Sequence, residues 1–370
     1  MSTAKKKYTA KSSVLRIIAQ VLAFLLTFVV ILLLTVYLMM QIFCRSSEAS
    51  RNTFITTVLE TGQMKFLASL CLSDEEIAEV VSANSMKELT DSNVNEGMIS
   101  IPQIEQGESI NGTAAAPQVS DKIEIIDIPG LTYKGTLMIV PDPSRVSLAT
   151  ICQGNDTWPA EGVTLEDMVN ASGAIGAING GLYNSTNNSG GNPYGVVVAD
   201  GEIVRNRPME FPGLVLVGLT KNNILQIIDI DGMSAADCAA MIEEKQIRDA
   251  VCFQEQATVD NNHFVQLIIN GKEREITGSG SGLNPRTAIG QRADGALLLL
   301  VTDGRGSNGH AGASAADLIE IMSRYGAVNA ANLDGGSSTC MYYNGEYLQN
   351  SVTFYYSQSS WKLPCAFIIK

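Results

Sequence analysis

The hydrophobic pattern begins with one long apolar run. The 28 residues between Arg16 and Arg45 carry no charge and are mostly Leu, Ile, Val, Phe and Met. A helix needs about 20 apolar residues to cross a bilayer. A cleavable signal peptide has an apolar core of about 7–15 residues that ends at small residues. This run is longer and has no small-residue site at its end, so it predicts an uncleaved transmembrane helix over residues 17–43.

Positive charge lies on one side of this run. Residues 1–16 hold five Lys or Arg and no acid, and positively charged flanks stay on the cytoplasmic side of a membrane. We therefore expect residues 1–16 to form a cytoplasmic basic tail. The chain is then a single-pass protein of the cell membrane whose folded part is extracytoplasmic.

The polar pattern beyond the run predicts a short helical segment and then a linker. Residues 46–84 have helical apolar spacing, and Ser73 with Glu76 has the form of a capping box. Residues 85–120 are rich in Asn, Ser, Gly, Gln and acids, and the apolar spacing is lost there. Such a composition is typical of flexible chain. We expect residues 44–122 to be a helical segment and a flexible stalk.

Residues 123–370 alternate between short apolar runs and amphipathic segments, which predicts one sheet-containing domain. Thr164, Ser234 and Ser314 are each followed three residues later by Asp, the pattern of a helix N-cap. Strand-like runs lie at 123–128, 137–140, 195–198, 214–218, 224–228, 264–269, 296–301 and 366–369. The expected fold class is α/β or α+β, a mixed twisted sheet flanked by helices.

Two of the predicted helix–strand units end alike. One strand runs into Asn179-Gly180-Gly181 and the other into Asp334-Gly335-Gly336. If the two strands are parallel neighbours, both turns emerge at one edge of the sheet. Ligands commonly bind at the carboxyl ends of strands in open α/β sheets, so we expect a site assembled from these distant turns.

The net charge and its distribution restrict the classes of partner that the protein can bind. The chain has 370 residues, 45 % of them hydrophobic, and a net charge of −13. Residues 1–50 carry +5, which leaves −18 for the remainder. An acidic body argues against nucleic acid as a partner, because phosphate binding requires Lys and Arg.

Histidine and cysteine usage restricts the kinds of metal or redox site. There are only two histidines, His263 and His310, and none of the seven cysteines forms C-x-x-C. A multi-His centre and a zinc ribbon are therefore disfavoured. Because the number of cysteines is odd, at least one thiol does not form a disulfide within the chain. A pairing of Cys340 with Cys365 stays open, as does a link between two chains through Cys44.

Four clusters rich in Gly and polar residues carry the candidate chemistry. They are Asn179–Tyr183, Asn284–Gly290, Val301–Arg305 and Leu333–Ser338. Each alone is also compatible with an ordinary turn or strand end. Together they supply two carboxylates, two arginines and backbone donors, a set that suits an anionic, hydroxylated ligand such as a sugar phosphate. His310 is either a proton shuttle or a solvated loop residue.

These clusters resemble, in order and spacing, the motifs of the phosphodiester glycosidase family. The N-G-G-aromatic turn reads Asn179–Tyr183, R-T-A-I-G reads Arg286–Gly290, D-G-R reads Asp303–Arg305 and L-D-G-G-S-S reads Leu333–Ser338. The resemblance covers about residues 135–370. Two features depart from the family pattern. Leu182-Tyr183 stands where Phe-Phe is usual, and residues 351–360 lack an arginine that many members carry.

The resemblance implies a hydrolase of sugar-1-phosphodiesters, such as a GlcNAc-1-phosphodiester. The single anchor and the acidic body fit a bacterial cell-surface protein that acts on envelope or exopolysaccharide polymers. Asp303 and Asp334 are the implied catalytic carboxylates, and Arg286 and Arg305 the implied phosphate ligands. The remaining implied substrate-binding residues are Asn179, Gly180, Gly181, Tyr183 (as a stacking platform for the sugar), Thr287, His310, Gly335, Gly336, Ser337 and Ser338.

Several alternatives stay open at the level of sequence. The domain could be a non-catalytic module that binds or assembles phosphosaccharides, or an enzyme that transfers the sugar to an acceptor other than water. No cofactor is implied with certainty, although Asp303 and Asp334 could share a divalent cation. The expected partners are a phosphosaccharide or cell-envelope glycopolymer and, through residues 17–43, the lipid bilayer.

Overall fold

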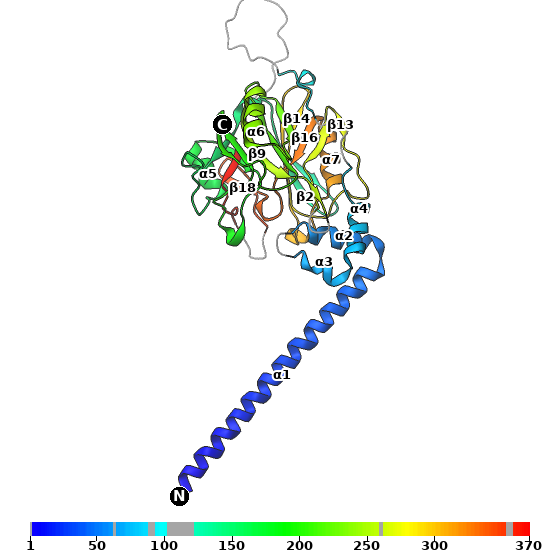
Figure 1. Ribbon diagram of the computed structural model, residues 1–370, viewed down its shortest axis with the longest axis vertical. Coiled ribbons are helices and arrows are strands. Elements are labelled where there is room, and N and C mark those ends of the chain that lie inside the picture. Colours follow the sequence, from blue (N-terminus) through cyan, green and yellow to red (C-terminus); the bar gives the residue numbers. More distant parts are fainter. Residues whose placement is uncertain (1, 62–63, 88–92, 102–121, 259–261, 353–357) are drawn as a thin grey trace, which may run out of the picture.

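One long helix leads into a sheet-rich body (Figure 1). The computed structural model describes residues 2–61, 64–87, 93–101, 122–258, 262–352 and 358–370, and only the backbone of residues 2–14. The helix α1 (Ser2–Ser46) contains a candidate membrane span, Leu15–Ser46, whose most apolar 18 residues are not buried in the protein. Three short helices follow it: α2 (Glu48–Leu59), α3 (Phe66–Cys71) and α4 (Asp74–Ala83).

The short helices form a small core of their own with the last turns of α1. Cys44, Ile55, Leu59 and Ile77 are buried together there. The capping box at the start of α4 is present, with the Ser73 side chain and the carboxylate of residue 76 each accepting a backbone N–H. Cys44 is almost fully buried, so it is not placed to link two chains as the sequence left open.

The described part of the body contains three large sheets and a two-stranded ribbon of β10 (Gln256–Ala257) and β11 (Asn262–His263). The first has the strand order β1 (Glu124–Pro129), β2 (Lys134–Val140), β15 (Leu297–Thr302), β14 (Arg286–Arg292), β16 (Ala327–Asn332), β12 (Gln266–Ile269) and β13 (Lys272–Glu273). The second has the order β18 (Glu346–Gln349), β17 (Met341–Tyr343), β4 (Gly176–Asn179), β19 (Cys365–Ile369) and β3 (Val146–Thr150). The third has the order β6 (Glu202–Asn206), β5 (Val196–Ala199), β9 (Ile247–Gln254), β7 (Leu214–Thr220) and β8 (Leu225–Asp229).

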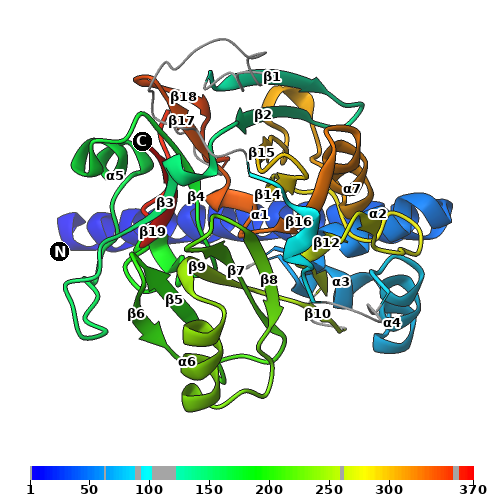
Figure 2. The same ribbon diagram turned by 90° about the horizontal axis from the view of Figure 1, so that it is seen from above.

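Each sheet turns one face to a shared core and the other to a single helix. Along β15, Leu297, Leu299 and Val301 lie in the shared core, while Leu298 and Leu300 pack toward α7, as the period of two in a strand requires. The covering helices are α5 (Leu165–Ser172) on the second sheet, α6 (Ala235–Glu244) on the third and α7 (Ala315–Arg324) on the first. Figure 2 shows these three helices on the outside of the body. The minor elements are β10 (Gln256–Ala257), β11 (Asn262–His263) and the 3-10 turns η1 (Glu96–Met98), η2 (Pro143–Arg145), η3 (Thr186–Asn188), η4 (Ser307–Gly309) and η5 (Gly336–Ser338).

The predicted fold class, sheet flanked by helices behind an apolar helix, is confirmed, and so are the three N-caps at Thr164, Ser234 and Ser314. The mixed character of the sheet was wrong, because the strand pairs among the described residues are antiparallel. The strands β15 and β16 do run parallel, but β14 is inserted between them.

The expectation of a stalk over residues 85–120 also needs correction in its described parts. The backbone of Lys87 donates to Glu275, and the backbone of Ser100 donates to Ala293. Val94 and Ile99 are buried in the shared core. These apolar positions are too few and too irregular to show a period, which is why the sequence did not reveal them. The segment 102–121 lies outside the described residues.

The N-terminal cap of α7 should contribute to the stability of the domain. Ser314 accepts the N–H of Asp317, whose carboxylate in turn accepts the N–H of Ser314. We expect Ser314→Ala to lower the free energy of unfolding by about 1 kcal/mol, measured by urea denaturation. Ser323→Ala, at an exposed position near the other end of α7, should change it by less than half as much. Equal effects of the two substitutions would contradict the capping role.

Candidate active site

The order of strands in the first sheet brings two of the predicted clusters together. The strand β14 pairs with β15 through Arg286↔Thr302 and with β16 through Ala288↔Asn332. The carboxyl ends of β15 and β16 therefore lie on either side of the start of β14. Asp303 follows the first of these ends and Asp334 follows the second, so the register of β14 places both carboxylates at one end of the sheet.

A single buried amide joins the third cluster to them. Asn179, at the end of β4 in the second sheet, donates from Nδ2 to the backbone oxygen of Asp334 at 2.7 Å. Its Oδ1 accepts from the Thr287 hydroxyl at 2.7 Å and from the Cys340 N–H at 3.2 Å. The two glycine turns thus meet as expected. They do so across two different sheets, because β4 and β16 are not neighbours in one sheet.

Asp334 is the carboxylate with the most unusual environment. Burial raises the pKa of Asp334 to about 7. Hydrogen bonds from the Ser338 hydroxyl and the Gly335 N–H, together with the charge of Arg305, lower the pKa but only in part offset the burial. The side chain keeps some contact with solvent. A carboxyl group in this state can hold a proton near neutral pH and still reach a ligand.

Asp303 is buried behind a histidine. Its Oδ1 accepts from the Lys134 N–H at 2.6 Å, and its Oδ2 lies 2.7 Å from His310 Nδ1. Only 2 % of its side chain is exposed, against 27 % for His310. The imidazole, rather than the carboxylate, is therefore the member of this pair that faces solvent. In this arrangement a carboxylate fixes the ring and its tautomer.

Arg305 connects the loop after β15 to the turn after β16. Its Nη1 donates to Ser337 Oγ at 2.8 Å and its Nε to Asn284 Oδ1 at 3.3 Å. Gly336 has a φ of +62°, and a Cβ there would lie 2.5 Å from Arg305 Nη2. Glycine is therefore favoured in this turn by its backbone conformation, and any other residue would also displace the Arg305 guanidinium.

Arg286 lies in a different setting from the one expected for a phosphate ligand. Its guanidinium forms a buried ion pair with Glu60, at the end of α2, and donates from Nη2 to the Gly282 carbonyl at 2.7 Å and from Nε to the Ala313 carbonyl at 3.1 Å. It also stacks on the Phe264 ring. These contacts are those of a residue that holds loops in place. Direct contact between Arg286 and a phosphate stays a prediction.

Glu60 was missed by the sequence reasoning. Besides the ion pair, its carboxylate accepts from the Gly282 N–H at 2.7 Å and from Asn284 Nδ2 at 3.1 Å. Glu60 precedes these partners by more than 200 positions and stands in the helical segment after the apolar run. No local pattern marks such a contact.

Comparison with known families agrees with the motifs that form this end of the molecule. A family described as phosphodiester glycosidase matches residues 172–370, more than half of the chain. The chain belongs to the phosphodiester glycosidase family.

A solved structure shows that the fold is shared with a member of this family. The catalytic domain of zebrafish N-acetylglucosamine-1-phosphodiester alpha-N-acetylglucosaminidase, described as auto-inhibited by its pro-peptide, superposes with a TM-score of 0.50 at 19 % identity. The match covers 69 % of this chain and 85 % of that one. A hypothetical protein from Synechocystis is more distant, with a TM-score of 0.40, 18 % identity and coverage of 67 % and 61 %.

A relative in sequence is the SPbeta prophage-derived uncharacterized protein YomE of Bacillus subtilis (strain 168). It is 42 % identical over 67 residues, which are 18 % of this chain and 10 % of that protein. The chain therefore matches a tenth of the length of this relative.

The first glycine turn of this glycosidase fold is packed more tightly than the sequence indicated. The Gly181 N–H bonds to the Cys365 thiol, and the Leu182 N–H donates to the Cys252 carbonyl at 2.7 Å. A Cβ at position 181 would lie 2.7 Å from Val251 Cβ. Of the two glycines, Gly181 thus uses its donor within the protein, so the expectation that paired N–H groups face a ligand is not met there. Cys365 and Cys340 are both buried and free, so they do not form the disulfide that the sequence left open.

Tyr183 is likewise inside the fold. It is 4 % exposed, and its hydroxyl forms a hydrogen bond with Ser338 Oγ at 3.0 Å. A ring in this position cannot serve as the open stacking platform that we expected. It supports Ser338, the hydroxyl that contacts the Asp334 carboxylate. Burial holds the pKa of the Tyr183 phenol well above its usual range, so this support stays protonated at physiological pH.

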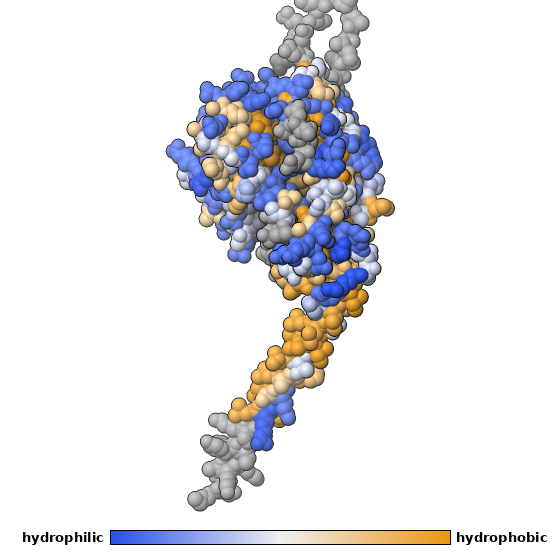
Figure 3. All heavy atoms as spheres, turned by 45° about the vertical axis from the view of Figure 1, so that its right-hand side comes forward, coloured by the Kyte–Doolittle hydropathy of each residue, from blue (hydrophilic) through white to orange (hydrophobic). Residues whose placement is uncertain are grey.

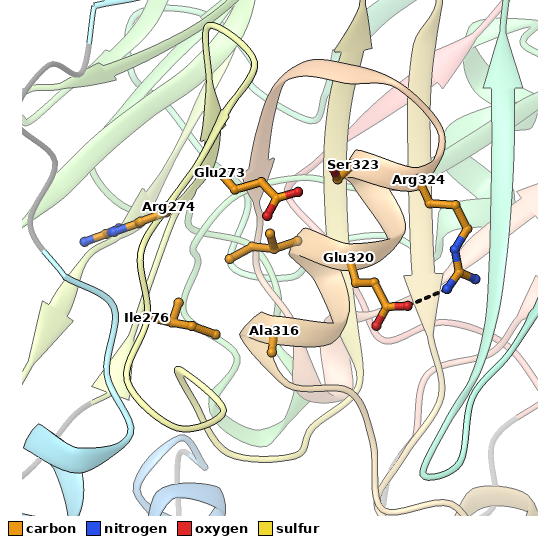
Figure 4. Close-up of a pocket in the computed structure, with 8 residues that line it drawn as sticks. Glu273, Arg274, Ile276, Ala316, Glu320, Ser323 and Arg324 are labelled. Atoms are coloured by element: carbon orange, nitrogen blue, oxygen red, sulfur yellow. Dashed lines mark hydrogen bonds and ion pairs between the residues drawn. The ribbon is translucent and has the colours of Figure 1, made fainter.

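Two other features lie apart from these residues. Within the described ranges, no three His, Cys, Asp or Glu side chains come together as a metal-binding group. A cavity of about 420 Å³ lies on the flank of α7, where Glu273, Ile276 and Ala316 are among its lining residues (Figure 4). None of the predicted site residues lines it.

The Glu60–Arg286 pair gives a test of how the site is held. Removing one member of a buried ion pair leaves the other charge uncompensated, which typically costs about 3–5 kcal/mol. We expect Glu60→Gln to lower the free energy of unfolding by that order in urea denaturation. The matched control is Glu79→Gln, at an exposed position on α4, which should be nearly neutral. Near-neutral behaviour of both variants would show that the pair does not hold these loops.

Proposed function

We propose that the protein is a membrane-anchored, extracytoplasmic glycosidase that hydrolyses sugar-1-phosphodiester bonds of the GlcNAc-1-phosphodiester type. One observation carries the proposal: in a chain of this family, Asp334 is a partly exposed carboxyl group with a pKa near 7, beside Arg305 and two serine hydroxyls. This combination can donate a proton while it binds an anionic phosphate.

The reaction replaces one bond to the anomeric carbon. A water oxygen forms the new bond to that carbon, and the bond from the carbon to the phosphate oxygen breaks with its electron pair kept by the phosphate. The products are the free sugar and a phosphomonoester. Positive charge develops on the sugar in the transition state, and negative charge develops on the leaving phosphate.

We assign the proton donor to Asp334. Burial keeps this carboxyl group protonated up to about pH 7, and an approaching phosphodiester anion favours the neutral form further. A positioned carboxylic acid of this kind can protonate the departing oxygen. Arg305 and Ser337, already hydrogen-bonded to each other, are the proposed phosphate ligands because a guanidinium suits phosphate geometry.

The Asp303–His310 pair is proposed to activate the water. With Nδ1 of His310 turned to Asp303, Nε2 is the ring nitrogen left to accept a proton. The buried carboxylate stabilises the imidazolium that forms, as in the histidine–carboxylate pairs of other hydrolases. Asp303 would then act through His310 instead of touching the sugar.

The location rests on the N-terminal helix. The most apolar 18 residues within its span Leu15–Ser46 have a mean hydropathy of 3.0 and are not buried, which supports a transmembrane helix over residues 17–43 behind a cytoplasmic tail of residues 1–16. In this view residues 44–122 form the juxtamembrane segment and residues 123–370 the glycosidase domain outside the cell membrane. Cell-envelope glycopolymers are the proposed substrates.

The first test measures release of free GlcNAc from a GlcNAc-1-phosphodiester. We expect turnover by the wild-type protein that falls as the pH rises through about 7, because the acid form of Asp334 is lost. Asp334→Asn should lower kcat by about 10²–10⁴-fold, abolish this pH dependence and leave the affinity for the diester within about threefold. Asp229→Asn, at an exposed position on β8, is the matched control.

Other outcomes of this test are equally informative. Binding of the diester without release of sugar by any variant would favour a non-catalytic binding or assembly module. Formation of a new glycoside in place of free sugar would show transfer to an acceptor other than water.

The kinetics of variants test whether Asp303 and His310 act as one unit. We expect Asp303→Asn and His310→Asn each to lower kcat by about 10²-fold, and the double variant to lose little more, because residues that act as a unit are not additive. Lys134→Met is the control, since the hydrogen bonds between Lys134 and Asp303 use only the backbone of Lys134. Fully multiplicative losses in the double variant would argue against a coupled pair.

A further inference from the structure

The juxtamembrane helices are fixed to the end of the transmembrane helix. Cys44 of α1 is buried among side chains of α2, α3 and α4. Gln41 Nε2 donates to the Leu70 carbonyl at 2.6 Å, which ties α1 to α3. The direction in which α1 leaves the body is therefore set by packing, as Figure 1 shows.

The same helices hold the loop that supports the proposed active site. Glu60 and Thr57, at the end of α2, bind the loop 278–285 through the Gly282 and Leu283 N–H groups. In this loop, Asn284 Oδ1 accepts a hydrogen bond from Arg305 Nε, and the Pro285 carbonyl accepts one from the Gly336 N–H. The juxtamembrane helices are thus connected to the proposed phosphate ligand Arg305 through two successive hydrogen bonds, from Asn284 to Glu60 and from Arg305 to Asn284.

These contacts bring the site close to the membrane. The helix α2 has 12 residues, and at about 1.5 Å per residue it is about 18 Å long. It begins two residues after α1 ends and reaches the site loop at its far end. The loop that supports the proposed phosphate site then lies within roughly 20 Å of the end of the apolar helix.

Exposed apolar side chains surround the junction. Phe43 on α1 and Phe66 and Leu70 on α3 are 47 %, 59 % and 46 % exposed. Figure 3 shows the apolar surface of α1 continuing onto the adjoining end of the body. Arg45 and Arg51 lie at the same junction, together with Glu48 and Glu76. Exposed apolar side chains, aromatic rings among them, at the end of a membrane span are typical of an interfacial anchor.

We infer that α3 rests in the outer surface of the bilayer and that the active site faces this surface, so that the substrate is a glycosyl phosphodiester whose aglycone is a lipid in the same membrane. The inference rests on the proposed function and narrows its substrate class. Water replaces the phosphate on the anomeric carbon as before. The phosphomonoester product stays in the bilayer, and the free sugar leaves.

The test compares two diesters that differ only in their aglycone. The full chain is reconstituted in vesicles of phosphatidylcholine and phosphatidylglycerol, with either a methyl GlcNAc-1-phosphodiester in solution or a long-chain alkyl GlcNAc-1-phosphodiester inserted in the same vesicles. We expect kcat/KM, at equal total substrate, to be at least about tenfold higher for the inserted diester, because confinement raises its concentration at a site that faces it. Faster cleavage of the soluble diester would overturn the inference while leaving the proposed function intact.

A paired variant shows whether the seating of α3 causes the preference. Phe66→Ser combined with Leu70→Ser changes only exposed side chains. It should keep turnover of the methyl diester and lose most of the preference for the inserted one. An unchanged preference for the inserted diester would show that α3 does not cause it.

A second measurement does not depend on activity. The wild-type chain has two tryptophans, Trp158 and Trp361, in the glycosidase domain. Phe66→Trp adds one at α3, and brominated lipids should quench this added fluorescence but not that of the wild type. Absence of added quenching would refute the seating in the membrane. Hydrolysis of neither diester would refute the proposed function and the substrate class together. The quenching measurement would still show whether α3 lies in the bilayer surface.

Discussion

The geometry of the proposed site depends on the buried amide of Asn179. This one side chain binds the backbone of Asp334, the hydroxyl of Thr287 and the backbone of Cys340, and so joins the ends of strands from two sheets. A buried amide must satisfy both its donor and its acceptor, because an unpaired polar group in the interior costs about 1–3 kcal/mol. The position of the Asp334 carboxyl follows from that requirement.

Asp303 and Asp334 are formally alike, but their surroundings give them different tasks. Asp303 is held by a backbone N–H and an imidazole, which satisfy an ionised carboxylate. Burial of Asp334 outweighs its hydrogen bonds and the charge of Arg305, and its pKa rises to about 7. A carboxyl group that keeps its proton near neutral pH suits the role of a general acid. The proposed mechanism therefore assigns the acid to Asp334, and it assigns the support of the base to Asp303 because Asp303 contacts His310.

The juxtamembrane helices link the proposed membrane anchor to the site. The ion pair between Glu60 and Arg286 is buried on both sides, and such a pair is strongly destabilising to break. It therefore fixes the orientation of the site relative to α1. An arginine that the family motif suggests as a phosphate ligand is, in this chain, also the attachment point of the N-terminal helices.

The sequence by itself determined the apolar helix, the helix caps and the four polar turns, because these depend on local spacing and on side chains within a few residues of one another. It also indicated the family, since motif order survives where overall identity is low. Only the tertiary structure decided that β14 separates β15 from β16, that Tyr183 is buried, that His310 covers Asp303 and that Glu60 reaches Arg286. These are contacts between segments distant in the chain, and their partners are selected by packing, which leaves no periodic trace in the sequence.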